Sequence, residues 1–297
     1  MAEHKQTPNV TRSQTITLWL VSLLVASLTA CHAAELNLGE EIAPGVRLLA
    51  RMSDLRIVES SGVVASRRYH NVLWTHNDGG GPKKQVLYAI DREGKTHASF
   101  PVVGPTFHDW EDIAIDDAGH LYVGDIGNND AKRDTLAVYE IDEPNPAASV
   151  SPISPNREWK LKFPAAPFDC ESLFIWKDYG YVISKVFDNA RAQIFRFPLK
   201  DGNGPLTLEP VATTEIESPV TGADISADGN LLGIVSKEGA YVYRIDGDVA
   251  RVSTGHPHHT KLKGEHIEGC CFVPDGLLAT SERRTIFLFT DPAFRGK

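Results

Sequence analysis

The amino-acid sequence predicts an all-β fold, and three observations lead to it. A short pattern occurs five times along the chain, with its copies 47 to 60 residues apart. Each copy contains apolar runs rich in β-branched and aromatic residues that alternate with polar positions, which is typical of strands. Turns that contain Gly separate these runs. A period near 50 residues in such a sequence predicts a ring of small sheets, a β-propeller of five blades.

Each copy of the pattern predicts the strands of one blade in order. The copies begin at the dipeptides Ser61-Gly62, Glu111-Asp112, Glu171-Ser172, Thr221-Gly222 and Glu268-Gly269. In the second copy we expect strands at 111–115, 121–124 and 136–141. Third strands are expected in the other copies at 86–90, 193–197, 240–245 and 285–289, and outer strands near 97–103, 157–163, 206–216 and 249–262. The stretch 143–155, rich in Pro, Ser and Ala, is expected to be a surface connection within the second blade.

The fifth copy ends at Phe289, before any fourth strand. Strand-like sequence that no copy uses lies before the first copy, at 45–51 (GVRLLAR). We expect this N-terminal segment to pair beside 285–289 and close the ring, because closure leaves no open sheet edge. The alternative is a propeller of six blades, with an irregular blade hidden in 143–168.

The N-terminal segment has the features of a secretory signal. Residues 16–30 are apolar and follow Lys5 and Arg12, and the run is too short for a comfortable membrane span. It ends in Leu28-Thr29-Ala30-Cys31, which resembles a bacterial lipobox, whose cysteine would become the lipid-carrying N-terminus of the mature protein. An ordinary signal peptide followed by a chance cysteine is the alternative.

These features predict a domain organisation and a location. We expect a lipoprotein signal peptide over 1–31 with lipidation at Cys31, a tether over 32–44 and a single propeller domain over 45–297. His32 follows the cysteine, whereas an Asp at this position favours inner-membrane retention in enterobacterial lipoproteins. By this resemblance we expect a cell-envelope lipoprotein that faces the periplasm or the cell surface, and the outer membrane is favoured over the inner.

Charge and cysteine content limit the possible partners. The chain has a net charge of −9 and no basic run, so nucleic acid is not expected as a partner and the membrane only through the lipid anchor. We expect a monomer. Besides Cys31 the chain has an odd number of cysteines, which are Cys170, Cys270 and Cys271. We expect them to be buried free thiols that pack as small hydrophobic side chains.

Polar residues occupy two sets of positions that a propeller brings together. The start of the first strand and the end of the second lie on the same face of the ring, because these strands are antiparallel. The starts carry Glu59, Ser61, Asp109, Glu111, Asp169, Glu171, Thr221, Glu265, His266 and Glu268, and the ends carry His76, Asn77, Asp78, Asp125, Asn128, Lys185, Lys237 and Glu282. The strand middles are apolar, so the sequence predicts a site at one mouth of the central channel.

Three interpretations of this mouth remain open: a solvated rim without a specific role, a metal site, and a catalytic site. Converging carboxylates repel one another, and a hard cation such as Ca²⁺ relieves the repulsion with oxygen ligands. The candidate metal ligands are Glu111, Glu171, Glu268, Asp109 and Asp125. The candidate catalytic residues are Glu111, Glu171, Glu268, Lys185 and His76, acting through a carboxylate pair or a metal-activated water. The candidate ligand-binding residues are His76, Asp78, Asp125, Asn128, Lys185, Lys237 and Glu282.

Two classes of function fit these candidates. One is a binding module whose mouth recognises a small molecule, a glycan or an envelope protein. The other is a metal-dependent hydrolase of lactone, phosphoester or glycosidic bonds. Trp74 and Trp110 flank the mouth in sequence and either stack on a ligand or, more commonly in propellers, pack between blades.

Several strings of residues add a resemblance to these inferences. The strings WTHNDGG, LYAID-x-x-G, DWEDIA, LYVGDIGNN, CESL and VTGADIS-x-DG cover roughly residues 57–280. They resemble a group of bacterial secreted and lipid-anchored β-propeller proteins and, more distantly, the gluconolactonase-like and esterase-like phytase propellers. The distant resemblance implies a Ca²⁺-supported site at the channel mouth, often with hydrolytic activity. Those distant relatives have six blades, whereas this sequence has five repeats.

Overall fold

The computed structural model describes residues 1, 38–104, 106–187, 190–200, 204–290 and 294. Cys31 and the predicted signal peptide from residue 2 onward lie outside the described residues, as do residues 32–37 of the predicted tether. No helix of the described part is long and apolar enough to cross a membrane.

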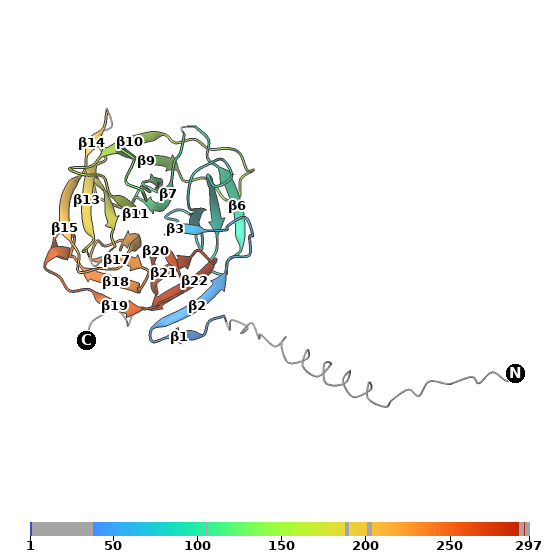
Figure 1. Cartoon of the computed structure of the whole chain (residues 1–297). Helices are drawn as coiled ribbons and strands as arrows, with labels where there is room; N and C mark the ends of the chain where they lie inside the picture. The colour runs from blue at the N-terminus through green and yellow to red at the C-terminus, as the bar shows by residue number, and fades with distance from the viewer. Residues whose placement is uncertain (2–37, 105, 188–189, 201–203, 291–293, 295–297) are drawn as a thin grey trace. The chain divides into compact units, whose positions relative to one another are not determined.

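Five sheets, each with a core of four antiparallel strands, surround a common axis, which confirms the five-bladed propeller (Figure 1). The innermost strands are β3 (Ser60–Ala65), β7 (Trp110–Ile115), β11 (Asp169–Trp176), β16 (Val220–Ile225) and β20 (Ile267–Val273). The second strands are β4 (Leu73–Asn77), β8 (His120–Asp125), β12 (Tyr179–Lys185), β17 (Leu231–Ser236) and β21 (Gly276–Ser281). The third strands are β5 (Val86–Ile90), β9 (Thr135–Asp142), β13 (Gln193–Pro198), β18 (Gly239–Arg244) and β22 (Thr285–Thr290).

The outer strands of the blades are β6 (Thr96–Pro101), β10 (Arg157–Lys162), β15 (Glu209–Thr213), β19 (His258–Lys261) and β2 (Val46–Arg51). The short strand β14 (Leu206–Thr207) pairs in parallel with β10, and β1 (Glu41–Ala43) pairs with β2. A 3-10 helix, η1 (Val249–Ser253), precedes β19. The apolar side chains of neighbouring blades pack against each other, so the core is a set of layers between the sheets.

The N-terminal strand closes the ring as the sequence predicts. β2 runs antiparallel to β22, with Val46 opposite Phe289 and Arg51 opposite Thr285. The six-blade alternative is wrong. Between β9 and β10 the only pairing in the described residues is one isolated bridge, from Ile153 to Val102, and β10 itself is the outer strand of the second blade.

We expect the closing strand to contribute strongly to stability. Leu48 of β2 is 3% exposed and lies opposite Phe287, whereas its neighbour Arg47 is exposed on the other face. Leu48→Asp should lower the free energy of unfolding by about 3 kcal/mol or more, because it buries an unpaired carboxylate in the core. The matched control Arg47→Asp should change it by less than about 1 kcal/mol. Equal losses in urea unfolding of the two variants would contradict closure by β2.

The channel along the propeller axis is blocked at the level of the second residue of each repeat. Glycines occupy this level in three blades, and a Cβ added at Gly269 would lie 2.6 Å from the Cα of Gly62. A Cβ at Gly222 would likewise lie 2.9 Å from the Cα of Gly269. Glycine is therefore needed here because these inner strands approach too closely for a side chain. The second blade instead has Asp112, which is fully buried.

The Asp112 carboxylate links three innermost strands. Its Oδ1 accepts the N–H of Ile113 at 2.9 Å, and its Oδ2 accepts the N–H of Leu173 at 2.9 Å and of Ala223 at 3.4 Å. Burial raises its pKa well above the usual range, against the effect of these hydrogen bonds. Because the axis is filled here, the two ends of the channel form separate pockets with no lining residue in common.

The three cysteines of the described domain are buried and free, which confirms the expectation for them. Burial raises the pKa of each thiol well above its usual value, so all three are protonated and unreactive at neutral pH.

Candidate functional site

A pocket of about 200 Å³ lies at the channel mouth where the innermost strands begin. Its lining contains six carboxylates and two lysines: Glu59, Asp78, Glu111, Glu171, Glu268 and Glu282, with Lys185 and Lys237. Ser60, Ser61 and Asn129 complete the lining. The fold thus brings seven of the sequence-predicted site residues into one cavity with an excess of negative charge.

Three carboxylates form a compact cluster on one side of this mouth. One oxygen each from Asp78, Asp109 and Glu111 lies within 4.8 Å of the others. Asp78 follows the end of β4 in the first blade, Asp109 immediately precedes β7 in the second blade, and Glu111 is the second residue of β7. The cluster therefore forms where these two neighbouring blades meet. Burial is the main reason that the pKa of each is raised, to about 6 for Asp78 and well above the usual range for Glu111. Neighbouring carboxylates raise all three further.

Gly127 provides room for this cluster. A Cβ at this position would lie 2.2 Å from Oε1 of Glu111 and 2.4 Å from Oδ2 of Asp109. The two carboxylates therefore lie against bare backbone, in the loop that follows β8. A side chain at 127 would push them apart.

The cluster has the properties of a cation site. Asp169 lies nearby, since its charge raises the pKa of both Asp109 and Glu111. Its Oδ1 accepts the backbone N–H of Asn128 at 2.7 Å, while its Oδ2 is buried without a hydrogen-bond partner among the described residues. Crowded carboxylate oxygens with one unsatisfied acceptor match the ligand preference of a hard cation such as Ca²⁺. The residues present therefore fit a metal ion.

Glu171 and Glu268, which occupy the position of Glu111 in two other blades, pair with lysines. Glu171 forms an ion pair with Lys185, and Glu268 with Lys237, whose Nζ also lies 3.5 Å from Oε1 of Glu282. Burial raises the pKa of Glu171 to about 7 and that of Glu268 to about 8, although the lysines lower both. The three glutamates expected as metal ligands, Glu111, Glu171 and Glu268, therefore line one pocket, but Lys185 and Lys237 lie beside two of them.

These raised pKa values predict how stability depends on pH when no cation is bound. An unfolded Glu titrates near pH 4.3, so between about pH 4.5 and 8 the unfolded chain holds fewer protons at Glu171 and Glu268 than the folded chain does. The free energy of unfolding should therefore fall as the pH rises through this range. In urea unfolding with chelator, Glu268→Gln should show a shallower fall than the unaltered protein. Identical slopes would show that Glu268 titrates normally.

Asp125 lies outside the pocket, although the sequence suggested it as a ligand. It is fully buried, and its Oδ1 lies 3.0 Å from Nη1 of Arg133. Its two oxygens also accept the N–H groups of His108 and Asp109 at 3.0 and 2.8 Å. These contacts use its acceptors, so Asp125 holds the backbone of Asp109 in place and does not face the cation cluster.

Asn128 and His76 also lie outside the pocket. The side-chain oxygen of Asn128 accepts the N–H of Arg133 at 2.9 Å, so the side chain shapes its own loop. His76 is fully buried, with Nδ1 3.0 Å from the carbonyl oxygen of Asn77 and its ring edge-on to Trp110. Burial lowers its pKa to about 4, so the ring is neutral at pH 7.

Both tryptophans that flank the mouth in sequence pack between blades. Trp74 and Trp110 are fully buried, and Nε1 of Trp74 donates to Oε1 of Glu143 at 2.7 Å.

The sequence analysis did not name Gly127, Asn129 or Lys84 as site residues. Lys84 pairs with Glu59 at 2.8 Å on the rim. The turn-rich string LYVGDIGNN carries two of these residues, but it does not indicate which backbone atoms approach the carboxylates.

No protein-family model and no curated protein matches the chain. Several solved structures do match the chain. A gluconolactonase from Xanthomonas campestris is 14% identical with a TM-score of 0.44, and the match covers 77% of this chain and 71% of that one. A chain of the nidogen/laminin complex is 11% identical with a TM-score of 0.42, covering 75% and 73%. The Dos1 propeller is 13% identical with a TM-score of 0.38, covering 75% and 53%.

Proposed function

We propose that the channel mouth binds Ca²⁺ through Asp78, Asp109 and Glu111 and that the occupied mouth recognises a small polar ligand. The observation that carries this proposal is the carboxylate cluster, whose oxygens lie within 4.8 Å of one another against the bare backbone of Gly127. A bound cation would supply positive charge for a ligand oxygen. The pocket volume of about 200 Å³ favours a small molecule or the end of a glycan over a protein surface.

The lysines of the mouth complement such a site. Each ammonium has three N–H donors, and the ion pairs with Glu171 and Glu268 leave donors available for a ligand. Lys185 is about one-tenth exposed and Lys237 about one-third, and both line the cavity. A ligand rich in oxygen acceptors fits these groups.

We expect Ca²⁺ to raise the melting temperature of the full chain and Glu111→Gln to remove most of this effect. The amide cannot replace a charged ligand, and at a hundredfold excess over its dissociation constant a ligand stabilises by about 2.7 kcal/mol. Without Ca²⁺, in chelator, Glu111→Gln should be as stable as the unaltered protein or more so, because it removes a buried carboxylate with a raised pKa.

The matched control is Glu209→Gln, which removes an exposed carboxylate that pairs with Arg196. This variant should keep the full Ca²⁺ effect. Metal analysis of the purified chain gives the ion's identity. An equal Ca²⁺ response of Glu111→Gln and Glu209→Gln in thermal unfolding would refute the site.

A metal-dependent hydrolase is the second candidate, and the pKa values of Glu171 and Glu268 favour it. At about 7 and 8 they lie where a carboxyl group can donate or accept a proton near neutral pH. Glu268→Gln should then abolish hydrolysis in a panel of lactones, phosphoesters and glycosides while Ca²⁺ binding remains. If the unaltered protein with Ca²⁺ hydrolyses no compound of the panel, the hydrolase is rejected and the binding module is the remaining function.

The cell-envelope location is part of the same proposal and rests on the sequence. Labelled fatty acid should appear on the unaltered protein when it is made in a bacterial host, and Cys31→Ser should abolish the labelling. If the unaltered chain is not labelled, the lipid-anchor prediction is wrong and the N-terminal segment is an ordinary signal peptide.

A further inference from the structure

We propose that the opposite end of the channel is a second binding site, which takes a single pyranose sugar, either free or at the end of a glycan. The pocket there has a volume of about 240 Å³ and is formed by the turns that follow the innermost strands of four blades. This volume is below the roughly 300–1,000 Å³ of pockets for drug-sized ligands, so the site suits one ring.

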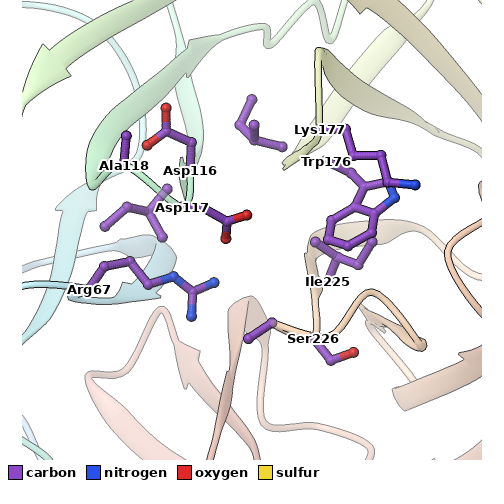
Figure 2. Close-up of a pocket in the computed structure, with 11 residues that line it drawn as sticks. Arg67, Asp116, Asp117, Ala118, Trp176, Lys177, Ile225 and Ser226 are labelled. Atoms are coloured by element: carbon purple, nitrogen blue, oxygen red, sulfur yellow. The ribbon is translucent and has the colours of Figure 1, made fainter.

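Trp176 supplies a fixed aromatic wall. Its Nε1 donates to the carbonyl oxygen of Gly247 at 3.2 Å, and its ring packs on Gly229, where a Cβ would lie 2.1 Å from the ring. These contacts hold the indole at the end of β11 with part of its surface exposed to the pocket (Figure 2). The C–H face of a pyranose packs well on such a surface, because the ring offers a large polarisable area without mobile torsions.

Two charged side chains face the same space without a hydrogen-bond or ion-pair partner among the described residues. Figure 2 shows the guanidinium of Arg67 and the carboxylate of Asp117 pointing into the pocket, across from Trp176. Both residues are exposed, and neither forms a hydrogen bond or an ion pair through its side chain with another described residue. Arg67 offers N–H donors and Asp117 offers acceptors. Sugar hydroxyl groups both donate and accept, so adjacent hydroxyls satisfy the two residues together.

The balance of charge in this pocket favours a neutral ligand. Arg67 and Lys177 are opposed by Asp116 and Asp117. The Asp116 side chain is already used, since it accepts from the N–H of His120 at 2.8 Å and from the Tyr122 hydroxyl at 3.1 Å. The site therefore lacks the excess of positive charge that an anion would need, in contrast with the acidic mouth at the other end.

Titration of the full chain with glucose, galactose, mannose and N-acetylglucosamine should give saturable binding of at least one sugar. Trp176 is the most exposed tryptophan of the described domain, so its fluorescence should report the binding. Arg67→Gln and Asp117→Asn should each weaken the binding by about tenfold, since each removes a hydrogen bond to a charged group. Both residues are exposed, so the fold should tolerate either change.

Two controls separate this site from the channel mouth. Arg244→Gln removes an exposed arginine outside the pocket and should leave sugar binding unchanged. Chelator and Lys237→Met, which affect the acidic mouth, should also leave it unchanged. The proposal is overturned if no sugar binds, if Arg67→Gln and Asp117→Asn bind like the unaltered chain, or if Lys237→Met abolishes binding. It is also overturned if zwitterionic amino acids bind and the sugars do not.

Discussion

Asp112→Ala is expected to lower the free energy of unfolding by about 2 to 5 kcal/mol, because it leaves buried N–H donors without an acceptor. The donors belong to Ile113, Leu173 and Ala223, on three different innermost strands. The loss would therefore weaken contacts between blades as well as within one. Relief of the buried carboxylate, whose pKa is raised, offsets only part of this cost.

Asp112→Asn is the matched comparison. Its amide oxygen can still accept the N–H groups of Leu173 and Ala223, so it should lose much less stability than the alanine variant. Urea unfolding at pH 7 measures the difference. If the two variants unfold at the same urea concentration, the hydrogen bonds of Asp112 do not hold the axis together.

Gly127→Ala is expected to weaken Ca²⁺ binding tenfold or more, about 1.4 kcal/mol for each factor of ten, although it changes no charge. The added methyl group would occupy the positions of the Glu111 and Asp109 carboxylate oxygens, which it would approach to 2.2 and 2.4 Å. Both contacts are with the ends of side chains that can rotate away, so the fold should survive while the cluster is displaced. In chelator, the melting temperature should therefore stay within a few degrees of that of the unaltered protein. Unchanged Ca²⁺ affinity would mean that these two carboxylates are not ligands.

Most of the fold could be predicted because it follows from local patterns that repeat. The third strands expected at 86–90 and 285–289 agree with β5 and β22 to within one residue. The pairing of 45–51 with the last blade followed from a missing fourth strand and the need to avoid an open edge. These features depend on alternation and turn residues, which a single sequence displays.

The site could be predicted in part, for a physical reason. Strand polarity alone places Glu111, Glu171 and Glu268 at one mouth, and the structure brings them into one pocket. The partners of each side chain depend on loop paths, which alternation does not describe. Arg133, in the loop between β8 and β9, forms an ion pair with Asp125. His76 is buried in the sheet and does not line the cavity.

Trp176 illustrates the same limit at the other end of the channel. It is the last residue of β11, directly before the turn residues Lys177 and Asp178, with no sequence motif around it. Its position opposite Arg67 arises only when the blades form a ring, since the two residues belong to different blades. Such combinations of turn residues from distant repeats require the closed structure.

Calorimetric titration of the chelator-treated full chain with Ca²⁺ at pH 7, in two buffers of different protonation enthalpy, tests the cation site most directly. Glu111 and its neighbours have raised pKa values, so a bound cation should displace protons from them. We predict binding of one Ca²⁺ per chain with net proton release, lost in Glu111→Gln and retained in Glu209→Gln. Absence of Ca²⁺ binding would contradict a Ca²⁺ site at Asp78, Asp109 and Glu111. Binding that releases no protons and that persists in Glu111→Gln would contradict it as well.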